Sequence, residues 1–118
     1  MISRLTGTVA EKQGGNVVLD VSGVGYSIRV GADTLKKLGV SKTQTVVSLW
    51  THLSVRENSL DLYGFCEKKD LVFFEMLIEI SGIGPKKALA ILNIADVETL
   101  HKAIRAGESA YLTKVSGV

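Results

Sequence analysis

The chain has 118 residues, an apolar fraction of 46% and a formal net charge of +2. This length fits one domain of ordinary size or two small ones, and no apolar run is long enough to span a membrane. The single cysteine, Cys66, excludes an intrachain disulfide, and the start of the chain lacks the apolar core of a signal peptide. Neither histidine has metal-ligand spacing. We therefore expect a cytoplasmic protein without a metal or cofactor, whose apolar excess supports a subunit interface.

The first 65 residues have the pattern of short strands separated by turn residues. Five strands are expected, at 2–10, 17–21, 26–30, 45–55 and 60–65. A short helix is expected at 32–38, ended by Gly39, and Gly7 predicts a bulge or bend in the first strand. Five strands with turns this regular predict a small barrel, for which the OB-fold is the five-stranded candidate.

OB barrels commonly bind single strands by stacking bases on aromatic side chains. The second and third expected strands supply only Tyr26 for such a face. Trp50, Tyr63 and Phe65 are expected in the core. A barrel that acts as a scaffold or oligomerisation module is therefore favoured over a single-strand binder.

From residue 66 the apolar spacing becomes helical. A first helix is expected at 67–80, a second from Pro85, and a third at 97–106, begun by Asp96 as N-cap and ended by Gly107. The predicted fold class is α+β with two domains: a barrel domain at 1–65 and an all-helical domain at 66–118.

The first two helices are joined by Gly82-Ile83-Gly84-Pro85. Glycines allow a sharp turn, with positive φ expected at Gly84, and leave no Cβ in front of the amides, while Pro85 can open the next helix. Exposed amides at a helix start bind anions, and Lys86 and Lys87 add positive charge there. This is the helix-hairpin-helix pattern, which holds nucleic-acid phosphates through backbone amides; an ordinary helical hairpin with a glycine turn is the alternative.

A second copy of the motif follows at a constant offset of 35 residues, where 112–118 aligns with 77–83. An internal repeat is a strong fold signal, and paired hairpins could hold both backbones of one duplex. Lys114, Ser116 and Gly117 are its candidate phosphate contacts, whereas Ile83 and Val118 are expected to pack beside the glycines. The second copy stops before its next glycine, so we interpret the chain as cut within a motif.

The net positive charge of the chain comes from its first 63 residues. Residues 1–63 hold 7 basic and 5 acidic side chains, and residues 64–118 hold 7 of each. The helical half is therefore not a basic patch, and its affinity must come from placed amides and a few lysines. Such contacts do not read base sequence.

Five further runs of the sequence are distinctive: Met1-Ile2-x-Arg4-Leu5-x-Gly7, Val21-Ser22-Gly23-Val24-Gly25-Tyr26, Thr51-His52-Leu53-Ser54-Val55-Arg56-Glu57, Leu62-Tyr63-Gly64-Phe65 and Gly82-Ile83-Gly84-Pro85-Lys86. Together these runs resemble the RuvA family over essentially the whole chain. The resemblance implies an OB barrel followed by two helix-hairpin-helix motifs. It further implies a homotetrameric plate that holds an open four-way (Holliday) junction during recombination, repair and the SOS response in the bacterial cytoplasm, with assembly of four or eight copies on DNA left open.

The resemblance also implies partners. The hexameric ATPase RuvB would move the junction arms while docked on a third RuvA domain, which is expected to be absent here, and the resolvase RuvC is a further candidate partner. The subunit itself would have no catalytic site. An acidic pin after the fourth strand, usually Arg-Glu-Asp in the family, would shape the junction centre. Here it reads Arg56-Glu57-Asn58, so the role transfers to Glu57 and is in question at Asn58, and Asp61 is expected inside the fifth strand.

Three alternatives remain open at this point. Helix-hairpin-helix modules also occur in glycosylases and nucleases, which need a catalytic Lys or Asp or clustered carboxylates, whereas the acids here are scattered. The hairpins could instead bind duplex DNA without junction specificity. They could also pack against a protein, in which case binding would be insensitive to salt.

Overall fold

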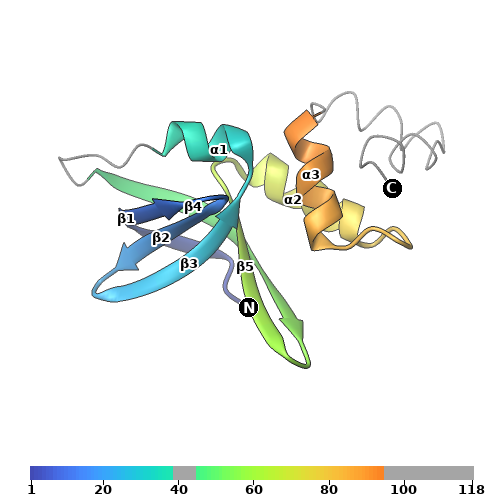
Figure 1. The fold of residues 1–118 in the computed structure, drawn as a ribbon, viewed down its shortest axis with the longest axis horizontal. Helices are drawn as coiled ribbons and strands as arrows, with labels where there is room; N and C mark the ends of the chain where they lie inside the picture. The colour runs from blue at the N-terminus through green and yellow to red at the C-terminus, as the bar shows by residue number, and fades with distance from the viewer. Residues whose placement is uncertain (39–44, 95–118) are drawn as a thin grey trace. The chain divides into compact units, whose positions relative to one another are not determined.

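The structure, a computed structural model, describes residues 1–38 and 45–94. Two compact units make up the chain, Met1–Leu71 and Val72–Val118. Figure 1 shows the course of the chain through both. The helix end expected at Gly39, the helix expected at 97–106 and the second glycine motif lie outside the described residues. The domain boundary predicted between residues 65 and 66 stays a prediction.

Five strands close into a barrel in the order β1-β2-β3-β5-β4 (Figure 1). Their bounds are β1 Arg4–Gln13, β2 Asn16–Val21, β3 Val24–Val30, β4 Val46–Arg56 and β5 Ser59–Phe65. All neighbouring strands are antiparallel except β3 and β5, which run parallel through three pairs of residues. The predicted class, a five-stranded barrel followed by helices, is confirmed.

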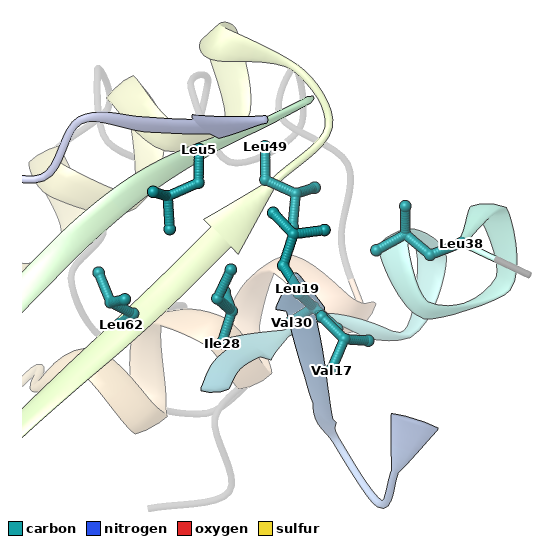
Figure 2. Packing of buried hydrophobic residues seen from close by; sticks show 8 residues of the cluster. All are labelled: Leu5, Val17, Leu19, Ile28, Val30, Leu38, Leu49 and Leu62. Carbon is teal, nitrogen blue, oxygen red and sulfur yellow. The ribbon is translucent and has the colours of Figure 1, made fainter. Parts of the chain in front are cut away.

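Apolar side chains at alternate positions along the strands fill the interior of the barrel. Side chains two residues apart point to the same face of a strand, which turns Val17 and Leu19 of β2 inward, both fully buried. Leu38, at the end of helix α1 (Ala32–Lys37), completes the interior. Figure 2 shows the cluster, which comprises Leu5, Val17, Leu19, Ile28, Val30, Leu38, Leu49 and Leu62.

The irregularity expected at Gly7 lies elsewhere in β1. The register between β1 and β2 shifts between Val9 and Glu11, so the bulge is at Ala10. Gly7 pairs regularly with Val47 on β4. A Cβ built on Gly7 would lie 2.1 Å from the carbonyl oxygen of Asp20, so glycine is required by the close approach of β2 rather than by a bulge.

Strands β2 and β3 are joined by the two-residue turn Ser22-Gly23. Both residues take positive φ, 51° and 94°, as a type I′ turn requires. A carboxylate oxygen of Asp20 accepts a hydrogen bond from the Gly23 amide at 2.8 Å. The turn therefore places a serine in a backbone region that asparagine and glycine adopt more readily.

Replacing Ser22 with asparagine should raise the free energy of unfolding by about 0.5–1 kcal/mol, because part of the left-handed backbone cost is relieved. Urea denaturation of both proteins measures the change. Ser27→Asn in β3 is the control, since Ser27 is exposed in regular strand backbone. No gain at Ser22 relative to this control would contradict the account of the turn.

Among the described residues, two helices follow the barrel, α2 Lys68–Ile78 and α3 Pro85–Ile94. In α2, apolar side chains at helical spacing are buried at Leu71, Phe74 and Leu77. In α3 the buried positions are Ala88 and Ile91, three residues apart on one helix face. In the described ranges, no helix has the length and apolar character needed to cross a membrane.

Candidate nucleic-acid interface

The turn between α2 and α3 is built from backbone hydrogen bonds and one left-handed residue. The Ile80 amide donates to the Leu77 carbonyl and the Ile83 amide to the Ile80 carbonyl, both at 3.0 Å. Gly82 takes a φ of 86°, which glycine adopts without steric cost. The chain therefore reverses at Gly82 and enters α3 with its geometry fixed by main-chain contacts.

The two glycines have different roles. The Gly84 carbonyl accepts the first hydrogen bond of α3, from the Ala88 amide at 2.9 Å, so Gly84 is the N-cap. Gly84 does not take a positive φ, and the expectation of one was wrong. An N-cap has extended rather than left-handed backbone, so the reversal needs glycine at Gly82 alone.

The start of α3 offers donors and positive charge to an anion. Pro85 has no N–H, and the amides of Lys86 and Lys87, within the first helical turn, have no acceptor inside the helix. The Lys86 side chain is exposed. The Lys87 ammonium donates to the Gly82 carbonyl at 3.2 Å, so this side chain folds back over the turn and braces it.

Charge at this helix start opposes the preference of the helix itself. The first turn contains Lys86 and Lys87 and no acid, although the positive end of a helix dipole favours acidic side chains. An anion bound to the amides would reverse that unfavourable term. The structure thus brings Gly82, Gly84, Lys86 and Lys87 to one turn suited to a phosphate.

The second candidate feature is the tip of the β4–β5 hairpin, which Figure 1 shows extending from the barrel. Arg56 pairs with Ser59, so Glu57 and Asn58 form the turn, and both are exposed. Neither takes a positive φ, so the turn accepts most residues at both positions. Asp61 lies within β5 opposite Ser54, as expected.

The candidate residues fall in different parts of the chain. The tip belongs to the unit Met1–Leu71, and the glycine turn belongs to the unit Val72–Val118. The predicted contacts Lys114, Ser116 and Gly117 lie outside the described residues.

Sequence reasoning placed Trp50 in the core with Tyr63 and Phe65. Tyr63 and Phe65 are buried, and burial is the main cause that raises the pKa of the Tyr63 phenol. Trp50 is only half-buried, and the cations of Arg4 and Lys68 lie over its ring. This group was missed because Arg4 and Trp50 are 46 positions apart, and only the β1–β4 register makes them neighbours.

Comparison with known proteins identifies both halves of the chain. Residues 1–64 match the family described as RuvA N terminal domain, and residues 74–118 match the family described as SAM-like helix-hairpin-helix tandem. The Holliday junction branch migration complex subunit RuvA of Pseudomonas fluorescens (strain SBW25) is 46% identical over all 118 residues. The protein of the same name from Pseudomonas aeruginosa (strain LESB58) is 44% identical. The chain covers 57% and 58% of these relatives, respectively.

Proposed function

The chain belongs to the RuvA family, whose N-terminal domain matches residues 1–64, and we propose that it binds four-way DNA junctions as the scaffold subunit of a branch-migration complex. The curated relatives named for that complex support the proposal across the full chain. The observation that carries it is the pairing, in one chain, of a phosphate-suited turn at 82–87 with a barrel whose hairpin tip is acidic at Glu57.

The phosphate contact follows from the geometry of the turn. Phosphate oxygens accept hydrogen bonds from the Lys86 and Lys87 amides, because these donors have no partner inside the helix. Gly82 and Gly84 keep Cβ atoms out of the approach, and Lys86 adds an exposed charge. Lys114, Ser116 and Gly117 provide the second contact. Binding of this kind contacts the DNA backbone and does not depend on base sequence.

The hairpin tip gives the preference for a junction. In a four-fold assembly, four copies of Glu57 face the crossover and repel the phosphates of strands that enter it. The position that carries a second acid in the resembling pattern is Asn58 here, so the ring holds half the charge. This difference favours, as a second candidate function, duplex binding with weak junction specificity.

The wider assignment follows from family membership. The protein acts as a homotetramer in the bacterial cytoplasm during recombination and repair, with RuvB as the ATPase of the complex and RuvC as a further partner. It has no catalytic site of its own. The barrel domain is assigned to 1–65 and the tandem helix-hairpin-helix domain to 66–118.

A gel shift with a four-way junction and a linear duplex of the same sequence tests the proposal, paired with the particle mass in solution. The expected result is a tetramer that binds the junction more tightly, with affinity that falls as salt rises. Equal affinity for both DNAs would support the duplex-binding alternative, and salt-independent association would point to a protein-interaction module.

Glu57→Gln should lower the ratio of junction to duplex affinity roughly three- to tenfold at low salt, and Asn58→Asp should raise it by a similar factor. Repulsion between unit charges about 9 Å apart is on the order of 1–2 kcal/mol at an effective dielectric near 20, and salt weakens it. Because the turn has no positive φ, Asn58→Asp changes charge without changing backbone preference.

The ratio of junction to duplex affinity is measured for Glu57→Gln and Asn58→Asp at two salt concentrations, with Asn58→Ser as the neutral control. If the ratio stays constant in all three variants at low salt, the tip carries no gating charge.

A further inference from the structure

One aromatic ring on the outside of the barrel lies close to two cations. Arg4 pairs with Trp50 across β1 and β4, and its guanidinium carbon lies 5.1 Å from the centre of the Trp50 ring. The Lys68 ammonium, from the start of α2, lies 5.4 Å from the same centre. Both are within the range of cation–π attraction. All three residues belong to the unit Met1–Leu71.

Among the described residues, no carboxylate pairs with either of these two positive charges, Arg4 and Lys68. The acid beside Lys68 in sequence, Glu67, pairs instead with Lys69 at 3.2 Å. Cation–π contacts hold Arg4 and Lys68 near one ring against their mutual repulsion. Two positive charges held this close together attract an anion.

The strand face directly next to the ring is polar and uncharged. The next cross-strand pair on this face is Thr6 and Ser48, whose hydroxyls lie 2.8 Å apart in a hydrogen bond. The first carboxylate further along is Asp20, opposite Thr8 on β2, and it already accepts from the Gly23 amide. An anion approaching along this strand face therefore meets donors before it meets an acid.

We propose that this face, formed by Arg4, Trp50 and Lys68, binds the phosphodiester backbone of a DNA strand, as a contact separate from the glycine turn. This proposal rests on the proposed function, because it adds a contact to a protein that binds DNA. The Arg4 guanidinium can donate two parallel hydrogen bonds to one phosphate, and Lys68 acts as a point charge on the next phosphate along the strand. Trp50 keeps both side chains positioned before the strand arrives, which reduces the entropy lost on binding.

Salt dependence of duplex binding tests the contact directly. Each lost phosphate contact should reduce the slope of log K against log salt by about 0.9, so Arg4→Gln/Lys68→Gln should reduce it by about 1.8. Lys68→Gln alone should reduce the slope by about 0.9. Its matched control is Lys69→Gln, which also removes one positive charge, from the adjacent residue that is paired with Glu67. Arg4 and Lys68 are exposed, so the variants should fold; circular dichroism checks this.

Trp50 is the only tryptophan in the chain, so its fluorescence reports on this face alone. Saturating duplex should change the emission with the same midpoint as binding, and the change should be lost in the double variant. Equal salt slopes for Lys68→Gln and Lys69→Gln, with unchanged emission at saturation, would overturn the proposal.

Two further outcomes separate this inference from the proposed function. A wild-type protein that binds no DNA contradicts the function itself, whereas normal junction preference with unchanged slopes contradicts only the barrel contact. An altered particle mass in the double variant with an unchanged slope also overturns the proposal, because the face would then join copies of the chain.

Discussion

Gly7→Ala is expected to lower the free energy of unfolding by about 3 kcal/mol, which is a large part of the stability of a small domain. The added Cβ would lie 2.1 Å from the Asp20 carbonyl oxygen, 2.8 Å from its carbon and 3.2 Å from the Val21 Cα. These are backbone atoms of β2, so no side-chain rotation relieves the overlap. The strands must separate, and the β1–β2 ladder must lose part of its register.

Gly15→Ala is the matched control for this prediction. Gly15 has no positive φ, and its added Cβ would meet nothing closer than the Val30 carbonyl oxygen at 3.9 Å. We expect the control to change stability by less than about 1 kcal/mol. Urea denaturation followed by far-UV circular dichroism gives both values; similar losses in the two variants would rule out strand approach as the reason for glycine at position 7.

The barrel was predictable because its signals are local. Val17 and Leu19 alternate with more exposed neighbours. Glycines mark the expected turn at 22–25, which the structure shortens to the two residues Ser22-Gly23. Each signal needs only a few consecutive residues, so β2 and β3 follow from sequence with small shifts at their ends. The same holds for Pro85 at the start of α3.

The errors concern features that depend on distant residues. Gly7 has the local signature of a bulge, and only the path of β2 shows that close approach is the cause. Trp50 is a large aromatic residue of a kind often found in protein cores, and only the β1–β4 register shows that Arg4 lies beside it. Single-sequence patterns carry no information about which strands will be neighbours at a given residue.

The glycine turn lies between these cases. Its motif predicted the helix break and the start of α3, because glycine and proline act on the backbone next to them. The motif did not predict that Lys87 folds back to the Gly82 carbonyl. It also did not separate the left-handed glycine, Gly82, from the capping glycine, Gly84.

Gly82→Val is expected to reduce affinity for junction and duplex DNA at least tenfold, or about 1.4 kcal/mol. The φ of 86° is strained for a branched residue. Apart from the two chain neighbours, no described residue has an atom within 4 Å of the added Cβ. The proposed contact needs that space for a phosphate that approaches the amides of Lys86 and Lys87. Distortion of the turn would also move the carbonyl that Lys87 holds.

Gly14→Val provides the matched control, because Gly14 also takes a positive φ, 60°, with open space around its Cβ. Both variants should lose a similar amount of stability, on the order of 1–2 kcal/mol, which urea denaturation measures. Only Gly82→Val should lose DNA affinity. This affinity is measured by fluorescence anisotropy under conditions in which both variants are folded. If the two folded variants bind the junction equally well, the strain of a left-handed valine explains every effect, and the phosphate site lies away from this turn.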